Sequence, residues 1–138
     1  MLKGVVERGT GVGAKVLRRP LAAKTGTTND FSNAWFVGYT PKLVTGVWVG
    51  YDRPRSLGAD ETGARVAVPI WVSYMSKLLV NMPVEDFPVP EGVVLVPVDL
   101  SPAGTCVRPV LMAFIRGTEP YTTCGPPVGA PERKAQSP

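Results

Sequence analysis

Two runs of aromatic and β-branched residues, joined by four residues that favour a turn, constrain the fold of this chain more than any other feature. The runs are residues 34–39 (AWFVGY) and residues 44–51 (VTGVWVGY). Such residues are enriched in β-strands, and Pro41 in the TPKL connection suits the second position of a turn. The pattern therefore predicts a β-hairpin in which Trp35 lies opposite Trp48 and helps to set the register.

The apolar spacing along the rest of the chain predicts further helices and strands. They are a short helix over residues 2–8, an extended segment over 21–28, a helix over 63–80, and two short strands over 93–98 and 110–115. The glycine-rich residues 10–14 are expected to form a loop. Because proline is costly inside a helix, the long helix is expected to start just before Pro69 or to be kinked there. Together these elements predict an α+β fold: a three-stranded antiparallel sheet with the helix on one face, followed by a small β appendage.

The composition fits one globular domain or a piece of one. Apolar residues make up 44% of the chain and charged residues 19%, which allows a packed core. We divide the chain into a body over residues 1–84, the β appendage over 85–124, and a disordered tail over 125–138. Residues 1–8 do not resemble a signal peptide, and no apolar run approaches the roughly 20 residues of a transmembrane helix. The chain, if made alone, is therefore expected to be cytoplasmic.

Missing residue types exclude several kinds of chemistry. The chain has no histidine, which excludes Ser-His-Asp and Cys-His catalysis. Cys106 and Cys124 are far apart without a second pair, so neither a metal site nor another cofactor is expected. These cysteines could form a disulfide in an oxidising compartment or remain free thiols, and both possibilities stay open. The net charge of +4 comes without a basic run interleaved with aromatics, so no nucleic-acid partner is expected.

The segment most suggestive of chemistry is Lys24-Thr25-Gly26-Thr27. Because side chains alternate along a strand, Thr25 and Thr27 should lie about 7 Å apart on one face, with Lys24 on the other. Two such hydroxyls can donate hydrogen bonds to a carboxylate, and the positive charge of Lys24 attracts an anion and eases ionisation of a neighbouring hydroxyl. Gly26 lets a peptide pair with the strand, and the Thr27 N–H is a candidate oxyanion donor. The alternative is a solvated lysine in a Thr/Gly turn.

Two other patterns in the chain suggest different chemistry. Residues 9–15 (GTGVGAK) are similar to a phosphate-binding loop, but Ala14 replaces the second glycine and Val16 replaces the hydroxyl residue that holds magnesium. A nucleotide-binding enzyme is therefore rejected. Ser73 and Lys77 are four positions apart on the expected helix, where a Ser-Lys dyad is chemically possible. An exposed polar pair is the ordinary explanation.

Five segments of the chain occur in the same order as in a known enzyme family. They are GVVERGTG, RPLAAKTGTTNDFSNAWFVGYTPKLVTGVWVGYD, LGADETGARVAVPIWVSYM, FPVPEGV and AFIRGTEP. They resemble the C-terminal part of the transpeptidase domain of class A penicillin-binding proteins, which are bifunctional peptidoglycan glycosyltransferase/transpeptidases. The resemblance covers roughly residues 1–120 and is most specific over residues 19–52. It implies part of a β-lactamase/transpeptidase-like fold.

The resemblance also implies a mechanism and a set of site residues. In this family the serine of an S-x-x-K motif attacks the D-Ala-D-Ala stem peptide of peptidoglycan, β-lactams acylate the same serine, and K-T-G lies on the facing strand. Lys24 then takes a catalytic role. The substrate-binding residues are Thr25, Gly26, Thr27 and Thr28. The family further implies a location at the periplasmic face of the inner membrane.

The other two motifs of the family are missing from the chain. None of its serines has lysine three positions later or asparagine two positions later, so neither S-x-x-K nor S-x-N is present. We therefore interpret the chain as a fragment of a D,D-transpeptidase that is inactive alone and meets stem peptide and β-lactams only when completed. The alternative is a non-catalytic truncation, or a small module that recognises peptide carboxylates through Thr25 and Thr27. The fragment is expected to expose apolar surface.

Overall fold

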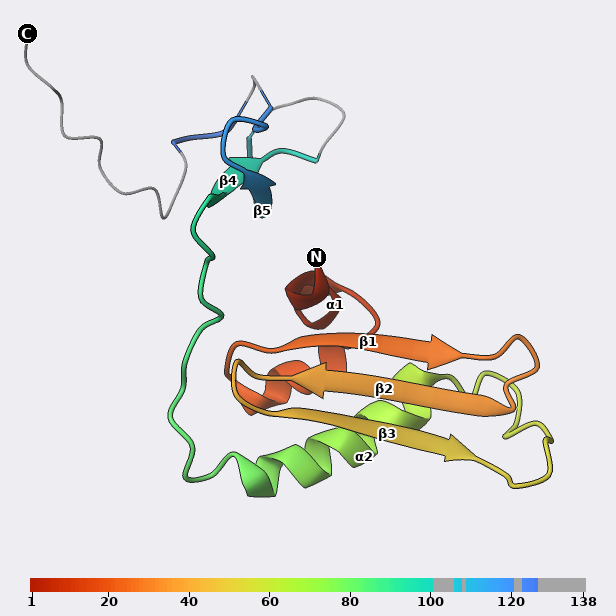
Figure 1. Ribbon diagram of the computed structural model, residues 1–138. Coiled ribbons are helices and arrows are strands. Elements are labelled where there is room, and N and C mark those ends of the chain that lie inside the picture. The colour runs from red at the N-terminus through yellow and green to blue at the C-terminus, as the bar shows by residue number, and fades with distance from the viewer. Residues whose placement is uncertain (101–105, 108, 121–122, 127–138) are drawn as a thin grey trace, which may run out of the picture. The chain divides into compact units, whose positions relative to one another are not determined.

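The computed structural model describes residues 1–100, 106–107, 109–120 and 123–126 (Figure 1). The predicted tail over residues 125–138 therefore lies outside the described residues, except for its first two. Backbone contacts divide the chain into unit 1, residues 1–87, and unit 2, residues 88–138. Among the described residues, no helix has the length and hydropathy that crossing a membrane requires.

Unit 1 is built on a three-stranded antiparallel sheet with the strand order β1-β2-β3. Its elements are α1 (Leu2–Arg8), the 3-10 helix η1 (Val12–Leu17), β1 (Ala22–Thr27), β2 (Asn33–Tyr39), β3 (Val44–Gly50) and α2 (Gly63–Leu78). The predicted hairpin is confirmed, with Trp35 opposite Trp48 in the register and their ring centroids 6.2 Å apart. The predicted α+β arrangement of sheet and helix is confirmed as well.

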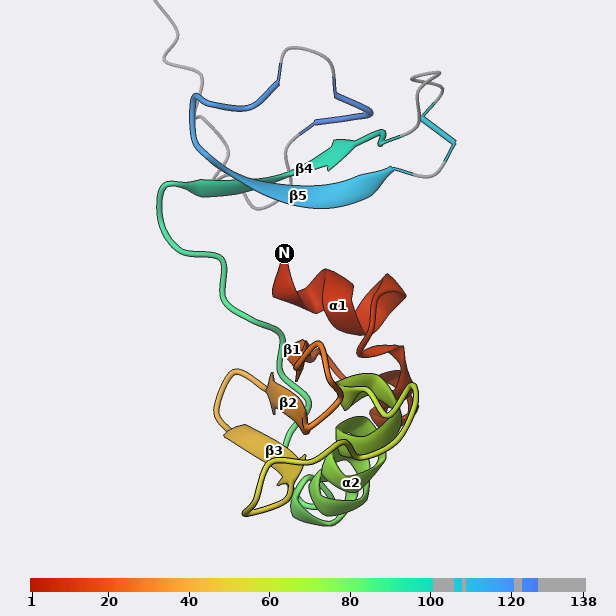
Figure 2. The same cartoon turned by 90° about the vertical axis from the view of Figure 1, so that its right-hand side faces the viewer.

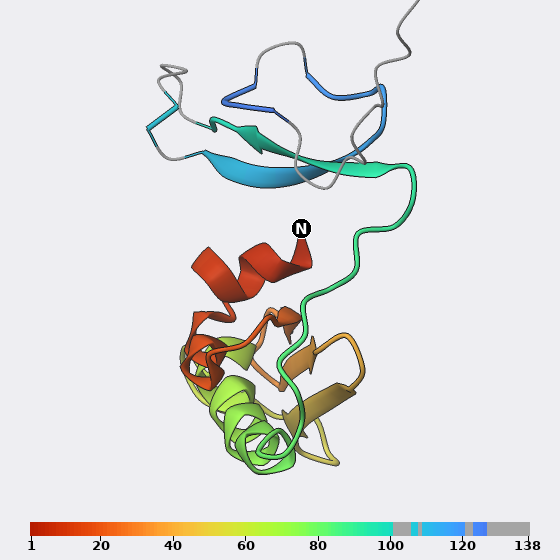
Figure 3. The same cartoon turned by 90° about the vertical axis from the view of Figure 1, so that its left-hand side faces the viewer.

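The core of unit 1 lies between the sheet and α2. Figures 2 and 3 look along the strands and show α2 on one side of the sheet. Phe36 of β2 and Trp71 of α2 are fully buried and meet edge to face, with ring centroids 5.1 Å apart. The Trp71 indole N–H donates to the Thr45 carbonyl at 3.1 Å, so this large side chain is buried without leaving its polar atom unpaired.

The opposite face of the sheet carries no helix of unit 1. Apolar side chains of β2 and β3 stay exposed on it, among them Trp35, Val37, Val44 and Trp48. This agrees with the expectation that the chain exposes apolar surface.

The long helix expected over residues 63–80 is confirmed, since α2 runs over Gly63–Leu78. Of the two alternatives for Pro69, a helix start just before it is wrong, because α2 already begins at Gly63 and Pro69 lies inside it. Pro69 and Arg65 are both exposed, so the Arg65 carbonyl that loses its helical partner lies on the solvent side, where water can replace the bond. The second error concerns the loop over residues 10–14, whose last part belongs to η1. Ala14 is fully buried there, and packing overrides the loop preference of the surrounding glycines.

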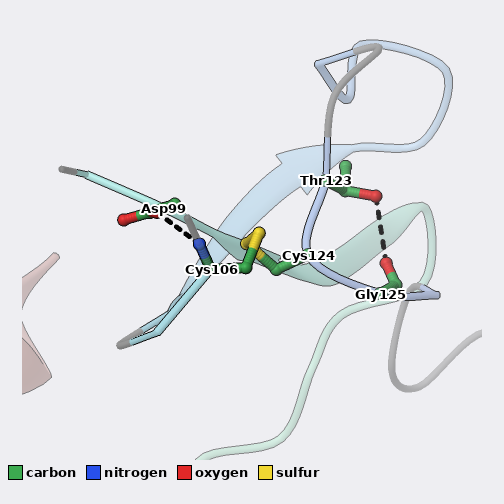
Figure 4. The surroundings of a disulfide bond; sticks show 5 residues. All are labelled: Asp99, Cys106, Thr123, Cys124 and Gly125. Carbon is green, nitrogen blue, oxygen red and sulfur yellow. Dashed lines mark hydrogen bonds between the residues drawn. A yellow bond between two sulfur atoms is a disulfide. The ribbon is translucent and has the colours of Figure 1, made fainter. Parts of the chain in front are cut away.

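Unit 2 contains the two short strands expected from the sequence, β4 (Val93–Val98) and β5 (Val110–Ile115), paired antiparallel. Cys106 and Cys124 form a disulfide with their Cα atoms 5.5 Å apart, which settles the question the sequence left open (Figure 4). The Cys124 N–H donates to the Pro97 carbonyl at 2.9 Å, and the Cys106 N–H donates to the Asp99 carboxylate at 2.6 Å. The disulfide thus joins two segments that are each hydrogen-bonded to β4 or to the residue just after it.

Candidate functional site

The K-T-G segment lies on β1, at one edge of the sheet. The strand order β1-β2-β3 gives β1 one strand neighbour, β2, among the described residues of unit 1. The unpaired backbone groups of an edge strand can accept an extended peptide as an additional strand. Gly26 pairs with Trp35, and a Cβ atom at this position would lie only 3.2 Å from the Trp35 Cβ. Glycine therefore keeps β1 flat against its neighbour at the centre of the motif.

The hydroxyls of Thr25 and Thr27 each form a hydrogen bond to a different segment, one to the connection between α1 and η1 and one to the start of α2. The Thr25 Oγ1 lies 2.7 Å from the Oγ1 of Thr10, which sits between α1 and η1. The Thr27 Oγ1 accepts a hydrogen bond of 3.0 Å from the N–H of Gly63, the first residue of α2. The alternation of β1 puts both hydroxyls on the face that carries the helices.

Lys24 is exposed, and its ammonium group donates to the Thr25 carbonyl at 2.6 Å. It pairs with Val37 in the register, and the alternation of β1 puts it on the face opposite to Thr25 and Thr27. The positive charge therefore stays beside the backbone of the motif, at the residue next to Thr25. Such a charge favours binding of an anion along β1.

Thr28, the last of the candidate residues, is engaged in the turn between β1 and β2. Its Oγ1 accepts hydrogen bonds of 3.0 Å from the N–H groups of Ser32 and Asn33. The Asp30 carboxylate accepts from the Ser32 hydroxyl at 2.8 Å and from the Ser32 N–H at 3.2 Å. The hydroxyls of Thr28 and Ser32, followed by the Ser32 N–H, lower the pKa of Asp30 below its ordinary value of 3.8. The turn thus combines side-chain and backbone donors around one carboxylate.

Acidification is expected to open this turn. The pKa of Asp30 is lowered in the folded chain. The ionised carboxylate therefore contributes fully to the stability of the turn above the ordinary pKa of 3.8, and this contribution is lost as the pH falls through the lower folded pKa. The amide proton of Ser32, followed by NMR from about pH 6 to about pH 2, should therefore shift with a midpoint below 3.8. In the control variant Asp30→Asn the same shift should disappear. A midpoint at or above 3.8 would contradict the assignment.

Sequence reasoning missed Thr10 and Gly63. Thr10 lies 15 positions before Thr25, in the glycine-rich residues 10–14 that were expected to form only a loop. No local signal therefore linked the two hydroxyls. Gly63 lies 36 positions after Thr27. A glycine at the start of a long helix does not point to a contact with Thr27, because its poor helix propensity only indicates a helix end. Its reason is steric, since a Cβ atom at Gly63 would lie 2.4 Å from the Trp35 carbonyl oxygen and 2.8 Å from that of Gly26.

The alternative pair Ser73 and Lys77 lies on the outer side of α2. Both side chains are exposed along an open surface that they line with Pro69, Ile70 and Tyr74. Among the described residues no hydrogen bond joins the Ser73 hydroxyl to the Lys77 ammonium group, and the Ser73 carbonyl accepts from the Ser76 hydroxyl. The pair therefore has the geometry of an ordinary exposed polar pair.

Comparison with known proteins extends over most of the chain. The family model "Penicillin binding protein transpeptidase domain" matches residues 1–71. Penicillin-binding protein 1A of Aquifex aeolicus is 50% identical over 127 residues, which cover 90% of this chain and 18% of that protein. The same protein of Pseudomonas aeruginosa is 48% identical over 100 residues, 72% of this chain and 12% of that protein.

A solved structure agrees with these sequence matches. The crystal structure of penicillin-binding protein 1A from Haemophilus influenzae superimposes with a TM-score of 0.73 at 34% sequence identity, over 88% of this chain and 20% of that chain. The chain thus spans about a fifth or less of the length of the relatives it matches. The matching family model, the identities and the shared architecture lead to one conclusion: the chain belongs to the penicillin-binding protein transpeptidase family.

Proposed function

We propose that this chain forms one wall of the acyl-transfer site of a peptidoglycan D,D-transpeptidase and holds the substrate peptide along β1. The substrate class is a stem peptide ending in D-Ala-D-Ala, and β-lactams bind at the same place. The observation that carries the proposal is the pair of hydroxyls on Thr25 and Thr27, on one face of an edge strand that also bears Lys24. The family membership of the chain supports the assignment.

Each residue of the motif has a chemical task in this proposal. The hydroxyls of Thr25 and Thr27 donate to the terminal carboxylate of the peptide, and the Thr27 N–H stabilises the oxyanion of the tetrahedral intermediate. Lys24 supplies positive charge near the carboxylate and near the attacking hydroxyl. Gly26 leaves room for the peptide backbone, and Thr28 contributes through the turn that follows β1. The nucleophilic serine comes from outside these residues, since the chain has no S-x-x-K sequence.

We also propose that the segment works on the periplasmic side of the inner membrane, as the family resemblance implies. The disulfide between Cys106 and Cys124 supports this location, because disulfides persist in oxidising compartments such as the bacterial periplasm.

The test is a chimera that supplies the missing nucleophile. Residues 1–87 replace the matched segment of the Haemophilus influenzae penicillin-binding protein 1A, and a fluorescent penicillin reports acylation. The chimera should be labelled, and Thr25→Val or Thr27→Val should each slow labelling about tenfold, because each removes a hydrogen bond to a charged group. Thr45→Val is the matched control, since the Thr45 hydroxyl bonds to the Met75 sulfur instead.

Two results would contradict the proposed function. One is a folded chimera whose labelling rate does not respond to Thr25→Val or Thr27→Val. The other is covalent labelling of the 138-residue chain by itself, because that would require a nucleophile among its own residues.

A further inference from the structure

The hydroxyls of Thr25 and Thr27 have partners that control where their protons can point. We propose that Thr10 is a positioning residue whose hydroxyl donates to the Thr25 Oγ1 and leaves the Thr25 proton free for the carboxylate of the substrate. This rests on the proposed function, because it gives a role to the residue behind one of the two carboxylate-binding threonines. The substrate itself does not touch Thr10.

The direction of the hydrogen bond at Thr27 follows from the chemistry of its partner. A hydroxyl has one proton to donate and two lone pairs that accept. The Gly63 N–H can only donate, so at 3.0 Å the Thr27 Oγ1 is the acceptor. The proton of Thr27 is therefore left for another acceptor, and a bound carboxylate is such a group.

The pair formed by Thr10 and Thr25 has two possible directions. At 2.7 Å between the two oxygens, either hydroxyl is able to donate. A carboxylate accepts hydrogen bonds and donates none, so an anion held by Thr25 takes the Thr25 proton. Thr10 then becomes the donor to Thr25, in the same way that the Gly63 N–H donates to Thr27. The bound anion is met by two parallel donor chains, one from Thr10 through Thr25 and one from Gly63 through Thr27.

The backbone around Thr10 is fixed, which makes its hydroxyl a defined donor. The N–H groups of Gly9 and Gly11, on either side of Thr10, both donate to the Val5 carbonyl, at 3.2 Å and 2.9 Å. A hydroxyl that accepts a hydrogen bond is a stronger donor through its own proton, because hydrogen bonds in a chain polarise one another. Thr10 is therefore suited to strengthen the hydrogen bond from Thr25 to the carboxylate.

A purely structural role for Thr10 predicts that its removal lowers the stability of unit 1, whereas a positioning role predicts a change in carboxylate affinity. Thr10 is exposed, and its bond to Thr25 joins two neutral hydroxyls that water can also satisfy. Removing that bond should change the stability of unit 1 little. Its effect should appear instead in the affinity for a carboxylate, and this difference separates positioning from packing.

The test compares Thr10→Val, which removes the donor at nearly constant shape, with Thr10→Ser, which keeps it. The probes are N-acetyl-D-Ala-D-Ala and the same dipeptide as its C-terminal amide. Each competes with the fluorescent penicillin in the chimera that carries residues 1–87, and the slowing of labelling measures the affinity of the probe. The unsubstituted chimera should prefer the acid to the amide. Thr10→Val should reduce that preference about fivefold, Thr10→Ser should retain it, and the control Thr45→Val should leave it unchanged.

Each outcome decides a separate point. If the chimera with Thr10→Val melts at the same temperature as the unsubstituted chimera but keeps the full preference for the acid, Thr10 has no positioning role, and the proposed function stands. If Thr10→Ser loses the preference together with Thr10→Val, or if Thr10→Val no longer folds, Thr10 acts through packing and the positioning proposal is overturned. If the unsubstituted chimera does not distinguish acid from amide, the proposed carboxylate recognition itself fails.

Discussion

Replacing Gly63 by alanine is expected to lower the free energy of unfolding of unit 1 by about 3 kcal/mol. The new Cβ atom would lie 2.4 Å from the Trp35 carbonyl oxygen and 2.8 Å from the Gly26 carbonyl oxygen. Both contacts are to backbone atoms of paired strands, which cannot rotate away as a flexible side chain can. The start of α2 must then move off the sheet, and the hydrogen bond from the Gly63 N–H to the Thr27 hydroxyl is lengthened or lost.

The sign of this effect makes the prediction decisive. Helix propensity alone predicts a gain of up to about 1 kcal/mol when alanine replaces glycine in a helix. Close packing of α2 on the sheet predicts a loss. Denaturant unfolding followed by tryptophan fluorescence measures the result, because Trp35, Trp48 and Trp71 all belong to unit 1.

A glycine of the sheet on which α2 packs provides the control. A Cβ atom at Gly46 of β3 would meet the Val37 side chain at 3.5 Å, an ordinary van der Waals contact. Gly46→Ala should therefore change the free energy of unfolding by less than about 0.5 kcal/mol. If Gly63→Ala were as stable as the original chain, the close approach of α2 to Gly26 and Trp35 would be incorrect.

Removing the disulfide of unit 2 is expected to cost about 3 kcal/mol, the size expected for a crosslink that closes a loop of this length. Cys106 and Cys124 are 18 positions apart, and β5 lies between them. A two-stranded sheet alone is marginally stable in water. The double variant Cys106→Ser/Cys124→Ser should therefore lose the protection of the β4 and β5 amides against hydrogen exchange.

The measurement can separate the two units within one sample. Tryptophan fluorescence reports on unit 1, whereas amide exchange in β4 and β5 reports on unit 2. Reduction of the original chain with a thiol should reproduce the exchange pattern of the double variant, which controls for the serine side chains. Unchanged protection of Val94 and Val96, which are buried in unit 2, would show that the disulfide does not hold this sheet.

Local patterns were enough for the strands and for the family. The hairpin was predictable because its two runs favour strand over several consecutive residues, and because a four-residue loop leaves one register, with Trp35 opposite Trp48. The strands β4 and β5 were predictable for the same reason, since β-branched and other apolar residues dominate both. The segment around Lys24 indicated the family because many consecutive residues around it match the family's sequence at once.

Proline and glycine were less informative, because their effects depend on which side of an element meets the core. Pro69 is tolerated inside α2 because the carbonyl it leaves unpaired lies on the exposed side of the helix. Part of a glycine-rich stretch adopts the helical conformation of η1 because Ala14 is buried against the core there. A single sequence shows the cost of a proline or a glycine but not the packing that offsets it.

The sequence by itself determined the strands, the long helix, the position of the K-T-G segment and the family, because each is carried by neighbouring residues. Only the tertiary structure decided which groups hold the two threonine hydroxyls and how the cysteines are paired. Thr10 meets Thr25 across 15 positions, Gly63 meets Thr27 across 36, and Cys106 meets Cys124 across 18. Such contacts follow from the docking of α2 and of the α1–η1 connection on β1, and of the loops around β4, which no local periodicity encodes.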